Sequence, residues 1–215
     1  MKNSSGHNLP APGIFYFILT LKTRNFRNFI VQTLNQFTMA TTKWVLDPSH
    51  SEVEFKVKHM MISTVTGTFS KFEATVETEG EEFTTAKATF IIDVDSISTK
   101  NEQRDGHLKS VDFFDTANFP QIKFVATKYD NVDNDGSYEV YGDLTVRGIT
   151  KNVKFDAEFG GVIKDPWGNT RAGITISGKI NRKEFGLTWS GATETGSLIV
   201  SEDVRIHAGL EFIKG

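Results

Sequence analysis

The stretch "SEVEFKVKH", residues 51–59, alternates apolar and polar side chains with a period of two. Val53, Phe55 and Val57 fall on one side of an extended chain, and the charged residues between them fall on the other. This pattern is typical of a strand that packs one face on a core and turns the other to water. His59 continues the apolar parity, so we expect its side chain on the inner face, near the end of the strand.

The same period of two returns along the rest of the chain, and turn signals such as "DNDG" and "DPWGN" separate the repeats. It recurs in "AKATFIIDV" (86–94), "YEVYGDLTV" (138–146), "VKFDAEF" (153–159) and, near the C-terminus, in residues 174–180 and 204–212. An open sheet of about eight such strands would leave two unprotected edges. The pattern therefore predicts an all-β fold whose antiparallel sheet closes or doubles up.

Composition limits the function. The chain of 215 residues has 18 Phe against 3 Trp and 4 Tyr, which suits a large dry interior because Phe has no polar group. The absence of cysteine excludes a disulfide framework, a thiolate metal site and a cysteine nucleophile. A net charge of −3 argues against nucleic acid or an anionic membrane surface as the main partner.

The first 38 residues differ from the rest in charge, because they carry four Lys or Arg and no Asp or Glu. Their apolar run "IFYFILTL" (14–21) is far shorter than the roughly 20 residues of a membrane span. A signal peptide would have its cations before the apolar run and a small-residue cleavage site after it. We interpret residues 1–38 as a basic extension and residues 39–215, beginning at Met39, as the folded domain; a transit-type or membrane-surface segment is the alternative.

Only one internal segment is predicted to be helical, "KNEQRDGHLKS" at residues 100–110. Thr99 is the expected N-cap, with Glu102 completing a capping box. Gly106 weakens such a helix by about 1 kcal/mol relative to alanine, so the helix should be short. It would join two strands across one end of a barrel and act as a lid. The apolar side chains expected over the opening are Leu108, Phe113 and Phe114.

Six blocks follow one another between about residue 43 and residue 212. They are "LDPSHSEVEFKVKHM", "VTGTFSKFEATV", "STKNEQRDGHLKSVDFFD", "NFPQIKF", "YGDLTVRGIT" and "INRKEFGL". In this order they resemble the YceI-like family of polyisoprenoid-binding proteins. The resemblance implies an eight-stranded, lipocalin-like antiparallel barrel that holds a long isoprenoid or quinone-type lipid. Some members of this family are exported with a signal peptide; since residues 1–38 lack a credible cleavage site, a cytoplasmic location is expected here and a periplasmic one is the alternative.

A slim lipid fits the physics of such a barrel, because eight strands leave room for side chains or one narrow ligand. A bilayer stabilises the lipid chain by nearly the same free energy as the barrel, about 0.8 kcal/mol per buried CH₂. The barrel and the bilayer therefore compete for the lipid on even terms, which suits a carrier. The residues expected to contact the lipid are Phe55, Val57, His59, Phe69, Phe90, Ile92, Leu108, Phe113, Phe114, Phe124, Leu144 and Phe155. Apart from the bound lipid, no cofactor is expected.

The polar residues of the helix admit two interpretations. Arg104 and His107, three residues apart, share one helix face, whereas Asp105 points elsewhere. An Asp and a His two residues apart cannot reach one proton on a helix, which argues against an acid–base pair. We expect Arg104 or Asp105 to anchor the lid by pairing with charged strand ends such as Arg147 or Arg182. Binding of a lipid head group by Arg104 or His107 is the alternative.

The remaining histidines give no metal or catalytic signature. No H-x-H or H-E-x-x-H spacing occurs, and neither a G-x-S-x-G elbow nor a P-loop is present, so we predict no metal site and no catalytic residue. His59 is expected either to bind a quinone carbonyl or a diphosphate at the barrel mouth, or to be a satisfied core histidine. His50 is expected to organise its turn with Asp47, Ser49 and Ser51.

The leading prediction is a protein that sequesters or transports an isoprenoid lipid such as a quinone or a polyprenyl phosphate. One alternative is an enzyme that modifies such a lipid, with His59 brought together with Asp105 or His107. Another is a stress-response barrel that acts through a protein partner. A transient membrane contact and a homodimer are both compatible with the leading prediction.

Overall fold

The computed structural model describes residues 40–132, 136–191 and 199–215, and the predicted extension 1–38 lies outside them. The strands are β1 (Thr41–Leu46), β2 (Glu52–His59), β3 (Ser63–Phe69), β4 (Phe72–Glu79), β5 (Glu82–Asp93), β6 (Ile97–Ser98), β7 (Gln121–Asn131), β8 (Ser137–Val146), β9 (Ile149–Lys164), β10 (Thr170–Asn181) and β11 (Val200–Lys214). The helices are α2 (Glu102–Lys109) and the short 3-10 helices η1 (Pro48–His50), η2 (Val94–Ser96) and η3 (Arg182–Phe185). In this part of the chain, no helix is both long and apolar enough to cross a membrane.

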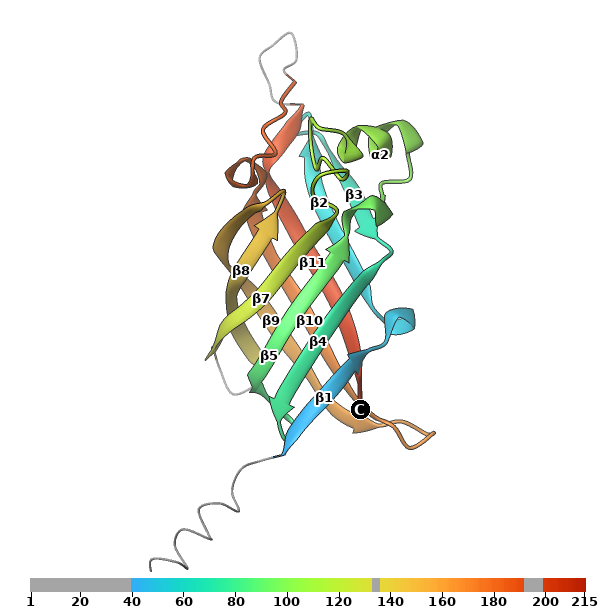
Figure 1. Ribbon diagram of the computed structural model, residues 1–215, viewed down its shortest axis with the longest axis vertical. Coiled ribbons are helices and arrows are strands. Elements are labelled where there is room, and N and C mark those ends of the chain that lie inside the picture. The colour runs from blue at the N-terminus through green and yellow to red at the C-terminus, as the bar shows by residue number, and fades with distance from the viewer. Residues whose placement is uncertain (1–39, 133–135, 192–198) are drawn as a thin grey trace, which may run out of the picture. The chain divides into compact units, whose positions relative to one another are not determined.

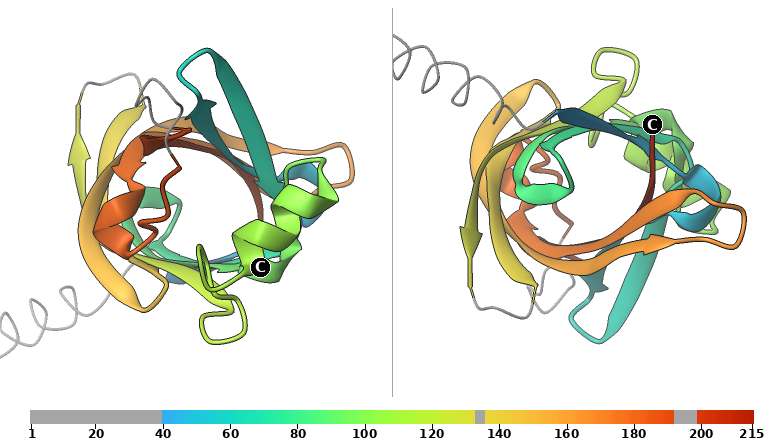
Figure 2. Two further views of the ribbon diagram at one scale, coloured as in Figure 1. Left: turned by 90° about the horizontal axis from the view of Figure 1, so that it is seen from above. Right: turned by 90° about the horizontal axis from the view of Figure 1, so that it is seen from below.

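The strands form a closed antiparallel barrel of eight strands (Figures 1 and 2). The order around the ring is β1-β4-β5-β7-β8-β9-β10-β11, and the pairing of β1 with β11 closes it. Every pair is antiparallel, as strands joined by short turns must be. The predicted fold, an all-β eight-stranded antiparallel barrel with one short helix, is confirmed.

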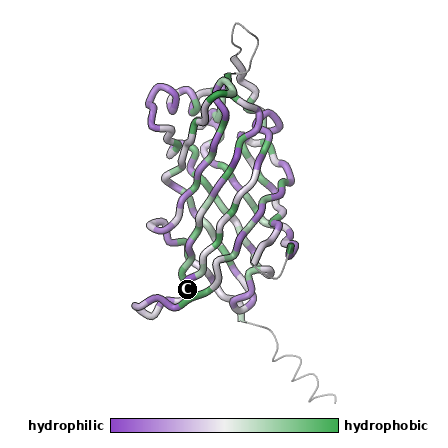
Figure 3. The backbone as a smooth tube through the Cα atoms, turned by 180° about the vertical axis from the view of Figure 1, so that it is seen from behind, coloured by the Kyte–Doolittle hydropathy of each residue, from purple (hydrophilic) through white to green (hydrophobic). Residues whose placement is uncertain are grey.

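The barrel has two distinct ends. We call the end that holds α2, the β2–β3 turn, the β8–β9 turn and η3 the upper end, as drawn in Figure 1. The lower end holds the β4–β5 turn, the β9–β10 turn and the C-terminus. Apolar and polar residues alternate along the strands between the two ends (Figure 3), as the period of two requires.

Strands β2 and β3 form a hairpin, here called the arm, that extends the wall at the upper end. One edge of β2 pairs with β11 and the other with β3. On its far side β3 pairs only with β6, at Thr68 and Phe69. Along Ser63–Gly67 this far edge has no strand partner within the described ranges, because β5 ends at Asp93 and the chain turns away through η2. The wall of the barrel is therefore interrupted beside the arm.

The helix α2 begins two residues later than the sequence suggested. Its N-cap is Asn101, whose side chain accepts a hydrogen bond from the Arg104 N–H at 2.9 Å. The prediction that Thr99 caps the helix is wrong, because Lys100 takes a left-handed φ of 61° and separates Thr99 from the first turn. Thr99 instead donates its N–H to the Asp105 carboxylate at 2.8 Å.

Candidate functional site

The interior of the barrel contains a cavity of about 420 Å³. This volume lies within the range of roughly 300–1,000 Å³ that is usual for ligand pockets. Its lining extends from Phe83 and Phe212 near the lower end to Leu187 and Trp189 at the upper end. Almost every atom exposed to the cavity is carbon, and such cavities stay dry and accept apolar ligands.

All twelve residues that the sequence put forward as lipid contacts line this cavity. Rings from nearby strands pack on one another along the wall, with centroids 5.6 Å apart for Phe55 and Phe69 and 5.5 Å apart for Phe124 and Phe155. Small residues between the rings leave the space open, namely Ala74, Ala86, Ala88, Ala126, Ala157 and Ala208. The inner faces of the strands thus supply rings and gaps rather than a solid core.

Glycines in neighbouring strands hold three of these rings against the wall. A Cβ at Gly142 would lie 2.4 Å from the Phe124 ring, and a Cβ at Gly67 would lie 2.2 Å from the Phe55 ring. Gly178 does the same for Phe155, where the distance would be 2.5 Å. Because each ring lies flat on bare backbone, it takes less of the interior than it would if it stood upright on the strand.

At the upper end, Arg104 and Asp105 both bind Thr99, which is buried. The Arg104 Nε donates to the Thr99 hydroxyl at 2.7 Å and its Nη2 donates to the Thr99 carbonyl at 2.8 Å. Asp105 accepts from both the N–H and the hydroxyl of Thr99. These contacts tie α2 to the chain that follows β6, so the expected ion pairs with Arg147 or Arg182 are wrong.

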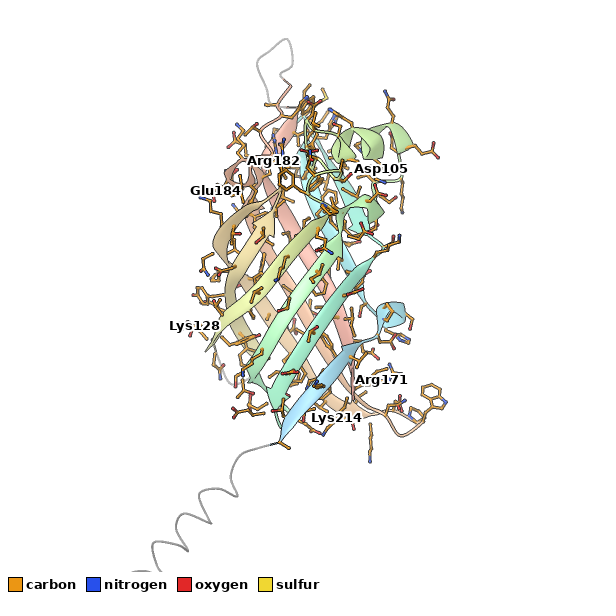
Figure 4. The ribbon with its side chains drawn as sticks, viewed as in Figure 1. Asp105, Lys128, Arg171, Arg182, Glu184 and Lys214 are labelled. Carbon is orange, nitrogen blue, oxygen red and sulfur yellow. The ribbon has the colours of Figure 1, made fainter. Side chains whose placement is uncertain are left out.

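Arg147 and Arg182 are engaged by backbone carbonyls instead. Arg147 donates to Gly186 at 2.9 Å and to Val111 at 2.8 Å. Arg182, only 3% exposed, donates to the carbonyls of Ser201, Leu187, Trp189 and Val200. Burial lowers the pKa of Arg182. These bonds join η3 and the segment 187–189 to the start of β11 and leave a buried positive charge in the upper wall of the cavity (Figure 4).

His107 lies beside Arg104 in the cavity lining, as their shared helix face predicted, whereas Asp105 is not part of the lining. Its Nε2 hydrogen-bonds with the Asp112 carboxylate at 3.1 Å, and its ring stands edge-on to Phe113 and Trp189 with centroids 5.1 Å away in both cases. The carboxylate partner is therefore Asp112 and not Asp105. No local pattern predicted this contact, because it depends on the tight turn after the helix.

His59 points into the cavity from the arm, as its parity predicted. Within the described part of the chain, nothing hydrogen-bonds to its imidazole. The interpretation as a satisfied core histidine is therefore not supported. Both ring nitrogens are available to a ligand at the upper end of the cavity.

Several lining residues were not named as lipid contacts. Ile174, Ile176 and Ile180 belong to the alternating pattern of β10, so their inward direction could be read from the sequence. Trp189 lies in a loop without periodicity, so its direction toward the cavity could not be predicted from the sequence. Tyr129 lines the lower part of the cavity, and burial raises its pKa to about 12. Its hydroxyl has no hydrogen-bond partner among the described residues.

A separate polar cluster lies at the lower end, where Asp47, His50 and Glu211 place their ligand atoms within 4.8 Å of one another. Arg171 already binds the carboxylates of this group, since it donates to Asp47 at 2.9 Å, to Asp165 at 2.7 Å and to Glu211 (Figure 4). The cluster is best explained as an ion-pair network that joins η1, the β9–β10 turn and β11.

The network also contains the turn predicted around His50. Its Nδ1 hydrogen-bonds with Asp47 at 3.0 Å, and the Ser49 and Ser51 hydroxyls donate to Asp47 as well. The hydrogen bonds from Ser49, His50 and Arg171 hold the pKa of Asp47 well below its usual range. The predicted role of His50 in organising this turn is confirmed.

Comparison with known proteins agrees with the geometry. A UPF0312 protein of Staphylococcus aureus is 44% identical over 172 residues, which are 80% of this chain and 97% of that protein. The YceI protein of Campylobacter jejuni superposes with a TM-score of 0.63 at 33% identity, covering 74% of this chain and 90% of that one. A polyisoprenoid binding domain from Saccharophagus degradans shares the fold with a TM-score of 0.58 at 17% identity, covering 82% of this chain and 99% of that one.

The sequence profile of the YceI-like domain matches residues 44–212, which include nearly all of the barrel and every residue discussed above as lining its cavity. This chain belongs to the YceI-like family.

Proposed function

We propose that this protein binds a long-chain isoprenoid lipid, of the quinone or polyprenyl phosphate type, inside the barrel and sequesters or transports it. The observation that carries the proposal is the cavity of about 420 Å³ with a lining that is almost entirely carbon. A polyprenyl chain has the matching shape, since it is narrow and apolar throughout. The relative from Saccharophagus degradans is described as a polyisoprenoid binding domain, which supports the same ligand class.

The polar groups of the upper end suit the head group of such a lipid. The imidazole of His59 has no hydrogen-bond partner among the described residues, and Arg104 and His107 line the same cavity. The buried charge of Arg182 adds a positive potential, because its guanidinium is satisfied by carbonyls and not by a carboxylate. A phosphate or a quinone carbonyl is stabilised by such surroundings. The lipid therefore lies with its head group at the upper end and its chain toward Phe83.

A binding role is favoured over the enzymatic alternative. Asp105, the carboxylate considered for an acid–base pair, is held by Thr99 through two hydrogen bonds. His107 contacts Asp112, but both side chains are about half exposed to solvent. General acid–base catalysis needs a group held within hydrogen-bond reach of the reacting atom. A carrier needs only an apolar space that competes with the membrane on even terms.

The test is extraction of lipid from protein purified without detergent, followed by mass spectrometry. We expect a stoichiometric isoprenoid. The variant Ala88→Phe adds a ring to the cavity and should lose the lipid, whereas Val125→Phe on the outer face of β7 is the matched control and should keep it. Stoichiometric lipid in Ala88→Phe, or none in the unaltered protein, would contradict the proposal.

A further inference from the structure

The tip of the arm exposes three consecutive apolar side chains. Met60, Met61 and Ile62 are 40%, 61% and 83% exposed. Single exposed apolar residues are normal on a protein surface, but a run of three at one turn is costly in water. The run lies at the upper end, where the cavity meets the arm.

The backbone of this turn makes the choice of residues more unusual. The Ile62 N–H donates to the His59 carbonyl at 3.2 Å, and the two central residues have φ values of 49° at Met60 and 61° at Met61. A hairpin turn with two left-handed residues strongly prefers Asn-Gly, because side chains with a Cβ are strained there. Methionine is therefore unfavourable at these positions both for the turn and for contact with water. Such a combination indicates a function that requires apolar groups at this place.

Charge next to the tip is also one-sided, although β2 carries Glu52 and Glu54 further from it. Residues 57–66 contain Lys58 and no Asp or Glu, in a chain with 27 acidic residues. Lys58 is exposed and makes no ion pair with the described residues. A short apolar tip with a cation behind it matches the interface of a bilayer with anionic lipids, where the apolar groups enter the acyl boundary and the cation stays at the head groups.

The arm is continuous with the cavity. Val57, His59 and Val65 on its inner face belong to the cavity lining, and the edge of β3 next to them lacks a strand partner within the described ranges. The tip is also held to the start of the neighbouring strand β11, since the Met60 N–H donates to the Ile199 carbonyl at 2.8 Å. A surface that contacts the tip would thus lie directly at the entrance.

We infer that the tip of the arm, Met60–Ile62, docks on the surface of a lipid bilayer, so that the isoprenoid passes between bilayer and cavity without crossing water. The inference rests on the proposed function, because a bilayer is where such a lipid resides. It assigns to the arm a step in loading and unloading, while the affinity for the lipid comes from the cavity.

The experiment uses the triple variant Met60→Asn, Met61→Gly, Ile62→Ser in the full chain. Asn-Gly suits this turn, so the melting temperature should stay the same or rise. The matched control replaces two exposed apolar residues of the lower end, Ile163→Ser with Trp167→Ser. Two quantities are measured with vesicles of phosphatidylcholine and phosphatidylglycerol: sedimentation of the protein with vesicles that lack isoprenoid, and the rate at which the protein takes up a long-chain quinone from loaded vesicles.

We expect the triple variant to sediment less with vesicles and to take up quinone more slowly by about tenfold or more, while its final quinone content is unchanged. The control variant should behave like the unaltered protein. Unchanged sedimentation and uptake in the triple variant would overturn the docking inference alone. Sedimentation without any quinone uptake in the unaltered protein would instead contradict the proposed function. A dimer that the triple variant makes monomeric would show that a second copy, and not a bilayer, covers the tip.

Discussion

The two ends of the barrel share one wall but are stabilised by different interactions. The lower end is filled by buried aromatic residues, Trp44, Phe83 and Phe212, and is crossed by the ion pairs of Arg171. The upper end holds its loops through hydrogen bonds from Arg104, Arg147 and Arg182 to Thr99 or to backbone carbonyls.

Two tryptophans make the comparison concrete. Trp44 at the lower end is 2% exposed, donates to the Thr78 hydroxyl at 2.9 Å and packs on Phe83. Trp189 at the upper end is only half-buried and contacts His107 and Phe113. Local opening is easiest where few apolar groups are fully buried. The upper end also has a buried cluster, which contains Phe113, Phe185 and Leu187, but Trp189 lies at its edge. The comparison indicates that the segment around Trp189 can open more easily than the cluster around Trp44.

The largest expected difference is between alanine variants of these two tryptophans. Trp44→Ala should lower the free energy of unfolding by about 3–5 kcal/mol, because it empties the lower cluster. Trp189→Ala should cost clearly less and should speed the exchange of bound lipid with vesicles. Denaturant unfolding and an exchange assay on both variants measure this. Equal destabilisation by the two substitutions would contradict the expected difference in stability between the two ends.

Acid should weaken the lower end in particular. The hydrogen bond from Arg171 and those of Asn169 hold the pKa of Asp165 well below its ordinary value of 3.8. A carboxylate with a lowered folded-state pKa stabilises the fold above its ordinary pKa, and this stabilisation is lost as the pH falls through the folded-state pKa. Stability should therefore drop as the pH falls below about 4. In Arg171→Met the drop should be smaller, although the variant starts from a lower stability at neutral pH.

Unfolding by denaturant at a series of pH values tests this prediction, with Lys179→Met as a control because its ion pair with Asp203 is exposed. If Arg171→Met loses as much stability at low pH as the unaltered protein does, the contact between Asp165 and Arg171 is not the cause of the sensitivity to acid.

At the upper end, Arg104→Ala should affect kinetics more than affinity. The substitution removes two hydrogen bonds to Thr99 and frees α2, but it leaves the apolar lining in place. We expect faster exchange of the bound lipid with vesicles and nearly unchanged lipid content at equilibrium. Exchange and content are measured on the same preparation. If Arg104→Ala abolishes binding in a folded protein, Arg104 is a head-group ligand and not a residue that anchors the lid.

The smallest effect is expected for His59→Ala. One lost hydrogen bond to a head group is worth roughly 0.5–1.5 kcal/mol, or up to about tenfold in affinity. Lipid occupancy should fall while the preference for chain length stays the same, since chain length is read by the apolar lining. A titration with quinones of different chain lengths decides this, and an unchanged affinity for all of them would remove His59 from the site.

The sequence predicted the repetitive parts of the molecule. The period of two placed Phe55, Phe90 and Phe155 on the inner face, because alternation in a strand fixes direction without knowledge of the partner strand. Positions set by long-range closure could not be predicted in this way. Beyond the end of β5, β3 has no strand partner along most of its far edge within the described ranges. Nothing in the local pattern of residues 63–69 indicates that this partner is absent.

The errors at the site have a similar cause. Thr99 has the chemistry of an N-cap, but the left-handed Lys100 moved the cap to Asn101. Arg147 and Arg182 have the charge of ion-pair partners, but loops distant in sequence bring carbonyls to them first. The alternating pattern carries no information about such contacts.

Tryptophan fluorescence can show whether an isoprenoid lipid occupies the cavity with its head group at the upper end. One variant keeps only Trp189 (Trp44→Phe, Trp167→Phe), and the other keeps only Trp44 (Trp167→Phe, Trp189→Phe). Loading with a long-chain quinone should quench Trp189 strongly and Trp44 weakly, and the same isoprenoid chain without a quinone ring should quench neither. Stronger quenching of Trp44 would place the head group near Tyr129 at the lower end. If neither tryptophan is quenched, the cavity does not hold the quinone. Either result would contradict the proposed binding of the lipid.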